Sequence, residues 1–351
     1  MTPDLRILGA GVFGLSCAIA ALRRDARVTV HDPHGPGAGA SGGVLGALAP
    51  HVPEPWNAKK AFQLDALLMG RTFWPEVEAL TGLSTGYVRS GRLQPVPSGG
   101  ADAARARRGA AALRWGDAAV WDVIPATGAA WEPPAPDGLL IRDTLSAHLH
   151  PARAVAAMAA AVEALGGTVT RNGPPEDAAP VIHATGVAGL AALSEGLDRP
   201  AGVPVKGQAA VLDLAVEGPQ LFVDGLHVVP HRDGTVAVGS TTENGVTDLT
   251  TDGALDDLVE RARALVPALG DAPVIRRWAG LRPRARTRAP VLGAWPSRPG
   301  RFVANGGFKI GFGMAPLVGE VMADLVLDGL DRVPDGFRVE DCLRNGQETG
   351  D

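Results

Sequence analysis

The most informative part of the sequence is Leu5-Arg6-Ile7-Leu8-Gly9-Ala10-Gly11-Val12-Phe13-Gly14. Its apolar start predicts a buried strand over residues 5–8, and the following residues predict a helix over 12–24. Between them, Gly9, Gly11 and Gly14 form the G-x-G-x-x-G pattern. The first glycine permits a tight turn, the second lets a pyrophosphate approach the backbone, and the third lets helix and strand pack closely. The free N–H groups at the start of the helix would face the phosphates. The stretch therefore predicts a dinucleotide-binding βαβ unit.

An acidic residue follows the second strand of this unit. The strand is expected from Arg27 to His31, and Asp32 stands eighteen residues after Gly14. A carboxylate at this spacing is typical of one that binds the ribose hydroxyls of a dinucleotide. It would also repel an additional phosphate, so NADP is not expected. The βαβ unit by itself fits both NAD and FAD.

The rest of the chain predicts a mixed α/β fold, in which a Rossmann-like domain is joined by a second, mostly antiparallel sheet domain. Helices are expected over 57–80, 151–165, 254–266 and the apolar stretch 315–330, and strands over 203–213, 226–229, 235–239 and 274–280, with others near Val291 and Val303. Residues 81–140 are rich in Gly, Pro, Ala and Arg, and they predict weak strands over 93–96 and loops near 133–138. The nucleotide-binding domain is expected to comprise 1–80, 145–200 and 286–351, and the substrate-binding domain 81–144 and 201–285.

Composition excludes several classes of protein. The 351 residues carry a net charge of −5, and the pI is about 5.9, which argues against attraction of the whole protein to nucleic acid. The two cysteines, Cys17 and Cys342, have no metal-binding spacing, so no metal site is expected. Acidic residues interrupt the apolar stretch 315–330, and the N-terminus lacks the basic region of a secretory signal, so no membrane span and a cytoplasmic location are expected.

The segment after Asp32 carries a family resemblance. It contains Gly39-Ala40-Ser41 and then Gly46, which resembles the GAS-x-x-x-x-G motif of the D-amino-acid oxidase and glycine oxidase family. Further stretches match that family in the same order along the chain: Val181 to Gly186, Pro204 to Gln208, His227 to Pro230, Gly280 to Pro283 and Gly306 to Pro316. The resemblance covers nearly the whole chain and implies a flavoprotein that holds FAD noncovalently.

The resemblance also implies which residues hold the flavin. Val169 would offer its backbone to the adenine, and the last helix would open toward the flavin at residues 311–314. A helix N-terminus there would stabilise the negative charge of the reduced flavin by about 0.3–2 kcal/mol. The implied FAD-contacting residues are Gly9, Gly11, Gly14, Asp32, Ala40, Ser41, Val169, Ala184, Gly186, Gly311, Phe312, Gly313 and Met314.

Four side chains are implied on the substrate side. Arg282 stands where the family places the arginine that binds a substrate carboxylate, for which a guanidinium fork is well suited. His227 replaces a tyrosine that glycine oxidases usually carry, and Lys309 replaces an arginine, so the pattern departs from one for glycine or D-alanine. His227 is interpreted either as a base or contact for a larger substrate or as a structural histidine. Lys309 is interpreted either as an aid to the reaction with oxygen or as a surface ion-pair partner, and His51 as a neighbour of the flavin ring.

The resemblance implies an oxidase of the C–N bond of a small amino acid or amine. Hydride would pass to flavin N5, and dioxygen would reoxidise the flavin and yield hydrogen peroxide. One alternative is action on a modified tRNA wobble uridine, with the arginines from Arg276 to Arg288 as an RNA-facing surface. Another is a dehydrogenase that passes electrons to a quinone or protein. The expected partners are the small substrate and dioxygen. Nucleic acid and membranes are not expected, and the sequence does not decide whether the chain forms homo-oligomers.

Overall fold

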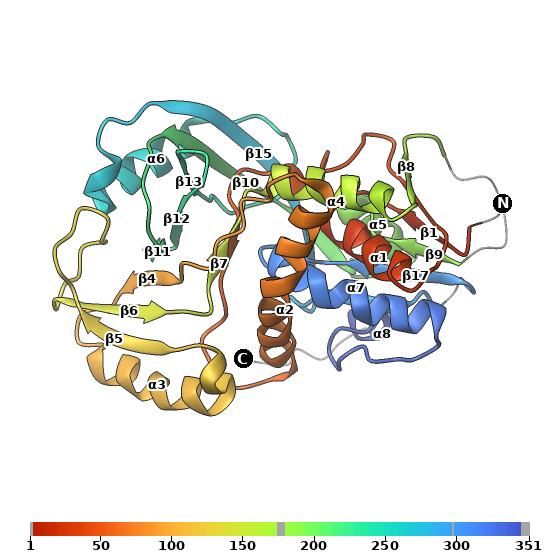
Figure 1. Ribbon diagram of the computed structural model, residues 1–351, viewed down its shortest axis with the longest axis horizontal. Coiled ribbons are helices and arrows are strands. Elements are labelled where there is room, and N and C mark those ends of the chain that lie inside the picture. Colours follow the sequence, from red (N-terminus) through yellow and green to blue (C-terminus); the bar gives the residue numbers. More distant parts are fainter. Residues whose placement is uncertain (1–2, 174–179, 297, 345–351) are drawn as a thin grey trace.

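The computed structural model describes residues 3–173, 180–296 and 298–344. The parts of the expected domain ranges at 1–2, 174–179, 297 and 345–351 lie outside the described residues. Figure 1 shows two main sheets lying side by side, with helices packed around each. The mixed α/β class predicted from the sequence is confirmed, whereas the division of the chain into two domains at the expected boundaries stays a prediction.

The first sheet has six strands and contains the glycine-rich stretch. Its strands are parallel apart from the edge strand β16, and their order is β16 (Val291–Ala294), β17 (Arg301–Asn305), β9 (Val181–His183), β1 (Leu5–Leu8), β2 (Val28–His31) and β8 (Thr168–Thr170). Parallel strands need helical crossovers, and those helices bury both faces of such a sheet. Here α1 (Val12–Leu22) packs against α4 (Pro151–Ala164) and α7 (Gly311–Leu327).

The second sheet is mostly antiparallel, as the sequence predicts. Its order is β14 (Glu243–Asn244), β10 (Gly202–Asp213), β13 (Thr235–Gly239), β12 (Leu226–Pro230), β11 (Gln220–Val223), β4 (Arg92–Pro95), β6 (Leu139–Asp143) and β5 (Trp121–Pro125), with β15 (Val274–Ala285) paired to β10. Helix α6 (Gly253–Leu265) packs against β10 and β13 and buries Leu255, Leu258 and Val259. The core of this sheet therefore lies between its strands and α6.

Smaller elements connect the two sheets. The short strands β3 (Ala47–Leu48) and β7 (Ala147–His148) pair with each other, and α2 (Ala58–Thr81) packs against α4 and α7. The side chain of Asn57 accepts a hydrogen bond from Lys60 N and caps the start of α2, and Gly82 ends this helix at a φ of +69°. The remaining described helices are α3 (Ala101–Trp115), α5 (Gly186–Leu193), α8 (Val339–Leu343) and the 3₁₀ turns η1 (Ala40–Gly42), η2 (Gly116–Ala118) and η3 (Pro267–Leu269).

The structure contains elements that the sequence did not predict. The stretch from residue 81 to 143 includes α3, β5 and β6 in addition to the expected strand, and residues 133–138 form a loop as expected. Only three residues of α3 are buried, Ala104, Ala111 and Trp115, so this helix has almost no apolar stripe to detect. The strand expected over 274–280 continues to Ala285, because β10 pairs with it along its whole length. The last helix, α7, begins at Gly311, the residue at which the family resemblance had it open.

Candidate active site

The glycine turn after β1 is closely packed, as the dinucleotide pattern requires. Gly9 has a φ of +103°, and a Cβ there would overlap the Ala184 carbonyl. A Cβ at Gly14 would overlap the carbonyl of Gly9, so α1 can lie against the end of β1 only with glycine at this position. Ala184 N donates to Leu8 O at 2.7 Å. The structure thus brings Gly9, Gly14 and Ala184 together at the start of α1.

Asp32 lies at the end of β2 beside this turn. Its Oδ2 accepts a hydrogen bond from Ala10 N at 2.9 Å, and its Oδ1 accepts one from His34 N at 3.0 Å. Each carboxylate oxygen accepts through several lone-pair positions. Asp32 is therefore fixed beside the glycine turn with acceptor capacity left for a pair of ribose hydroxyls.

The segment of the Gly-Ala-Ser motif folds back onto the start of α1. Ser41 Oγ accepts from Val12 N at 3.0 Å, and a Cβ at Gly11 would lie 3.2 Å from the same oxygen. Gly37 N donates to Ala10 O at 3.1 Å. Ala40 and Ser41 form a 3₁₀ turn and are partly exposed. Residues 37–42 therefore cover the glycine turn and leave the Ser41 hydroxyl free to donate to a phosphate.

A second helix N-terminus lies beside the first. A Cβ at Gly311, the first residue of α7, would lie 3.6 Å from Val12 Cγ1 at the start of α1. The first N–H groups of each helix have no partner within the helix, and the two positive dipole ends reinforce each other. Phe312 packs against Trp74 at a ring distance of 6.3 Å, while Gly313 and Met314 are buried in the core. The convergence of both helix ends favours a ligand that carries negative charge.

Val169 and Gly186 lie at two other positions around this region. Thr170 O accepts from Asp32 N at 3.0 Å, so Thr170 directs its backbone groups toward β2. Since these groups alternate along a strand, Val169 directs its N–H and carbonyl to the free edge of β8, where an adenine can pair with them. Gly186 starts α5 at a φ of +56°, and its carbonyl accepts from Asn305 Nδ2 at 2.9 Å.

The residues present fit FAD on these observations. A carboxylate is held beside a glycine turn, two helix ends converge, and the free edge of β8 can receive an adenine. Arrangements of this kind hold the ribose, the pyrophosphate and the base of a dinucleotide.

Arg282 is buried in the pair formed by β10 and β15. It is 8% exposed, its Nη1 donates to Thr241 O at 3.2 Å, and its guanidinium lies against the backbone of Gly207. No carboxylate of the described residues forms an ion pair with it. Burial lowers its pKa to about 10, an effect that the charge of Glu243 opposes. A buried guanidinium without a carboxylate partner is costly, and a substrate carboxylate would supply that partner.

Lys309 lies near this arginine, and His227 lies near Lys309. His227 packs on Phe222 at a ring distance of 4.7 Å, and its Nδ1 is buried without a hydrogen-bond partner. Burial, aided by the charges of Arg92 and Lys309, lowers the pKa of His227 to about 3, so this ring is neutral near pH 7. Lys309 Nζ donates to Thr242 Oγ1 at 2.9 Å. Partial burial, followed by the charge of Arg282, lowers the pKa of Lys309.

His51 is held by a different element, the helix α2. Its backbone N donates to Gln63 Oε1 at 2.9 Å, and its Nδ1 lies 2.7 Å from the same oxygen. Gln63 is buried in α2 and donates to Ala49 O at 3.1 Å. These contacts fix the segment after Pro50 to α2. The position of His51 beside a flavin ring stays a prediction.

Trp278 was missed in the sequence. Side chains alternate along a strand, so Trp278, Gly280 and Arg282 share one face of β15. The indole lies over Gly280, where a Cβ would overlap it, and a Cβ at Gly43 would lie 3.4 Å from the ring. Trp278 therefore connects the Gly-Ala-Ser segment to the strand that carries Arg282. The alternation Trp278-x-Gly280-x-Arg282 was the available signal.

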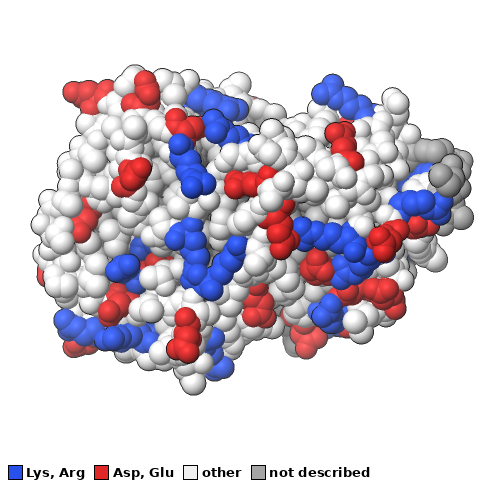
Figure 2. Space-filling view, viewed as in Figure 1, with Lys and Arg blue, Asp and Glu red and all other residues white. Residues whose placement is uncertain are grey.

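The arginines from Arg276 to Arg288 do not form one continuous surface. Arg277 pairs with Asp256, Arg282 is buried, and Arg286 donates to the carbonyls of Cys342 and Arg344. On the face in Figure 2, basic and acidic side chains are intermixed. The arrangement gives no support to an RNA-facing arginine strip.

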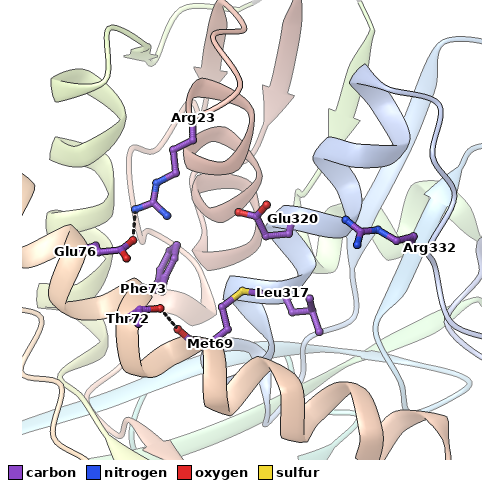
Figure 3. A pocket seen from close by; sticks show the side chains of 8 residues that line it. All are labelled: Arg23, Met69, Thr72, Phe73, Glu76, Leu317, Glu320 and Arg332. Atoms are coloured by element: carbon purple, nitrogen blue, oxygen red, sulfur yellow. Dashed lines mark hydrogen bonds and ion pairs between the residues drawn. The ribbon is translucent and has the colours of Figure 1, made fainter.

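A cavity of about 320 Å³ lies elsewhere, between α1, α2 and α7. Figure 3 shows its lining side chains, among which Arg23 pairs with Glu76. Arg23 follows the last turn of α1, at the opposite end of the helix from Gly11, and none of the sequence-predicted site residues line this cavity. Among the described residues, no cluster of three His, Cys, Asp or Glu is arranged to hold a metal, and none of the helices is long and apolar enough to cross a membrane.

Comparisons with known proteins show the family of this chain. Residues 4–325 match the family model described as FAD dependent oxidoreductase. The bifunctional protein ThiO/ThiG of Nostoc sp. strain PCC 7120 is 28% identical over 93% of this chain and 53% of its own length. The chain thus spans about half the length of such curated relatives.

Two solved structures share the fold. The glycine oxidase of Geobacillus kaustophilus has a TM-score of 0.83 and 22% identity, with 96% of this chain and 98% of its own chain covered. The iminodiacetate oxidase (IdaA) of Chelativorans sp. BNC1 has a TM-score of 0.77 and 25% identity, with coverages of 95% and 98%. Because the family model spans nearly all of the described residues and the site fits its cofactor, the chain belongs to the FAD-dependent oxidoreductases of the D-amino-acid oxidase kind, and FAD is its cofactor.

Proposed function

We propose that this chain oxidises the C–N bond of a small amino acid or amine that carries a carboxylate, and that Arg282 binds this carboxylate. The observation that carries the proposal is the buried guanidinium of Arg282, which has no carboxylate partner among the described residues. FAD, when bound, accepts a hydride from the substrate carbon and returns the electrons to dioxygen, which gives hydrogen peroxide.

The residues around Arg282 supply orientation. Two parallel hydrogen bonds from the guanidinium would fix both the position and the orientation of the carboxylate. Trp278, on the same face of the strand, would limit where the rest of the substrate can lie. His227 is neutral near pH 7 because its pKa is about 3, so it can accept or donate a hydrogen bond but carries no charge. Fixing the substrate carbon in this way reduces the entropy cost of reaction.

The names of the related structures suggest the first compounds to test. Glycine oxidase and iminodiacetate oxidase both appear among them. Anaerobic mixing of the yellow protein with glycine, sarcosine, D-alanine and iminodiacetate should bleach the flavin with at least one of them. Admission of oxygen should then return the colour with one hydrogen peroxide per substrate. Reduced flavin that reacts only slowly with oxygen would instead indicate an electron acceptor other than dioxygen.

The variant Arg282→Met tests the role of the arginine. Loss of a charged, bidentate contact costs about 3 kcal/mol, so kcat/KM should fall by about 10²-fold or more while the flavin spectrum is kept. Arg276→Met is the matched control, because Arg276 is an exposed arginine on the same strand. If both variants lose the same activity, or neither does, Arg282 does not bind the carboxylate.

A further inference from the structure

Two cations of the candidate site contact consecutive residues. Arg282 Nη1 donates to the carbonyl of Thr241 at 3.2 Å, and Lys309 Nζ donates to the hydroxyl of Thr242 at 2.9 Å. Consecutive Cα atoms are about 3.8 Å apart, and the charge of Arg282 acts on Lys309, so the two cations lie near each other. Neither Arg282 nor Lys309 forms an ion pair with a carboxylate among the described residues.

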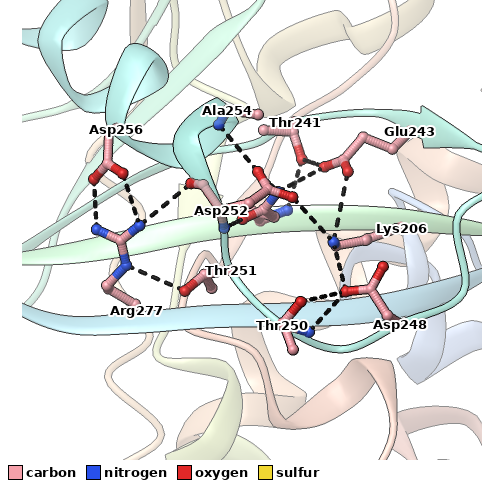
Figure 4. Close-up of polar contacts among 11 residues, drawn as sticks. Lys206, Thr241, Glu243, Asp248, Thr250, Thr251, Asp252, Ala254, Asp256 and Arg277 are labelled. Atoms are coloured by element: carbon pink, nitrogen blue, oxygen red, sulfur yellow. Dashed lines mark hydrogen bonds and ion pairs between the residues drawn. The ribbon is translucent and has the colours of Figure 1, made fainter.

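A polar network fixes the segment that holds these cations. Lys206 is 1% exposed, and its Nζ lies 3.0 Å from Asp248, 3.4 Å from Asp252 and 3.7 Å from Glu243. Figure 4 shows these contacts converging on the ammonium group. The chain from Thr241 to Asp252 is therefore tied to β10 at both of its ends.

Gln208 completes the network beside Lys206. Its Nε2 donates to Glu243 at 3.0 Å and to Asp252 at 2.8 Å, and its backbone N donates to Thr241 Oγ1 at 2.8 Å. Thr241 Oγ1 in turn donates to Glu243. The carboxylate of Glu243, the acid whose charge acts on Arg282, is thus engaged by Lys206, Gln208 and Thr241. The positions of Thr241 and Thr242 are set before any substrate binds, so the two cations are preorganised.

We propose that Lys309 is a specificity-determining residue and that the substrate is a dicarboxylate. This inference rests on the proposed function. One carboxylate binds Arg282 and the second binds the ammonium of Lys309, whose hydrogen-bond partner among the described residues is the hydroxyl of Thr242. A monocarboxylate would leave one of the two positive charges without a partner. The two cations repel each other, because the charge of Arg282 contributes to lowering the pKa of Lys309.

Matched pairs of compounds test the second carboxylate. Iminodiacetate and sarcosine differ by one carboxylate on the same secondary amine, and D-aspartate and D-alanine differ in the same way on a primary amine. Wild-type kcat/KM should be at least about tenfold higher for the dicarboxylate of a pair that reacts. Lys309→Met should bring this ratio close to one, Lys309→Arg should keep it, and Arg276→Met should leave it as in the wild type.

Binding provides a readout that needs no turnover. Malonate and acetate should perturb the flavin spectrum of the holoenzyme, with malonate at least about tenfold tighter in the wild type and at most about twofold tighter in Lys309→Met.

The outcomes separate this inference from the proposed function. Equal affinity for malonate and acetate in the wild type, or an equal loss for both members of a pair in Lys309→Met, would mean that Lys309 does not bind a second carboxylate. The dicarboxylate proposal would then be wrong, while the proposed amine oxidation would stand. Preferential malonate binding with no compound able to bleach the flavin would contradict the proposed function and leave the dianion site in place.

Discussion

The guanidinium of Arg282 occupies the space that a side chain at Gly207 would need, since a Cβ there would overlap Nη2. Gly207 lies directly opposite Gly280 in the β10–β15 ladder, and Trp278 covers Gly280 in turn. The side chains of Arg282 and Trp278 thus pack flat against two glycines that are paired across the strands. The position of Arg282 therefore depends on the missing side chain at Gly207 as well as on the hydrogen bond to Thr241.

Gly207→Ala is therefore expected to displace Arg282 without removing it. The added methyl group requires the guanidinium to move, so KM for a carboxylate substrate should rise by about tenfold or more, since a small misplacement of a binding group is costly. Gly109→Ala is the control, because Gly109 lies in α3 with no atom near its Cβ position. Steady-state kinetics on both variants checks this, and an unchanged KM in Gly207→Ala would show that the arginine does not bind substrate in this position.

Asp32→Asn is expected to weaken FAD binding. The change removes the charge that accepts from Ala10 N and would accept from the ribose hydroxyls. Hydrogen bonds to a charged group contribute about 1.5–3 kcal/mol, so the FAD dissociation constant should rise by about 10- to 150-fold. Titration of apoprotein with FAD measures it, with the fully exposed Asp102→Asn as control. Equal constants for wild type and Asp32→Asn would exclude the ribose contact.

The flavin should leave the protein intact on denaturation. Both cysteines are buried, and burial raises the pKa of Cys17 to about 12, so this thiol stays protonated. Cysteine attacks as the thiolate, so Cys17 is not an attachment site for the flavin, and noncovalent binding is expected. After acid or heat precipitation, the yellow colour should be in the supernatant and should migrate as FAD; a yellow pellet would contradict this.

Stability should fall at acid pH because of buried histidines. Burial, with the charges of His150 and His148, lowers the pKa of His231 to about 3, against a weaker opposing effect of Asp233. An unfolded histidine titrates near pH 6.5, so between about pH 3 and 6.5 the unfolded chain binds a proton that the native state does not, and unfolding free energy rises with pH.

His231→Gln should therefore reduce the slope of unfolding free energy against pH by up to about 1.4 kcal/mol per pH unit within this window. Urea unfolding at pH 4 to 7 measures the slope, with the exposed His34→Gln as the control. Identical slopes for His231→Gln and wild type would show that His231 does not titrate as its burial requires.

Local signals made the cofactor half of the site predictable. The spacing of Gly9, Gly11, Gly14 and Asp32 lies within one short βαβ unit, so sequence distance translates directly into spatial distance. The long-range parts were less accessible. The contact of Gly311 with Val12 joins opposite ends of the chain, and no local pattern shows that the two helices begin side by side. Placing Gly311 there relied on the family resemblance.

The substrate half shows the same limit. Arg282 was found through its motif, but its burial and its lack of a carboxylate partner depend on the pairing of β10 with β15. A single aromatic residue in a strand usually indicates only core packing, so the sequence did not predict that Trp278 lies at the site. The Lys206 network could not be predicted either, since it joins β10 to a segment some forty residues later, through Asp248 and Asp252.

The twelve-residue strand β15 touches three separate hydrophobic cores. Val274 packs in the core under α6, Trp278 joins the small cluster around Val44, and Ala285 belongs to the core that contains β16 and β17. A strand that is paired along its whole length cannot leave one core while remaining in the others. Melting should therefore be a single cooperative event that spans both sheets, and amides at the centre of β15 should exchange with solvent only through global unfolding.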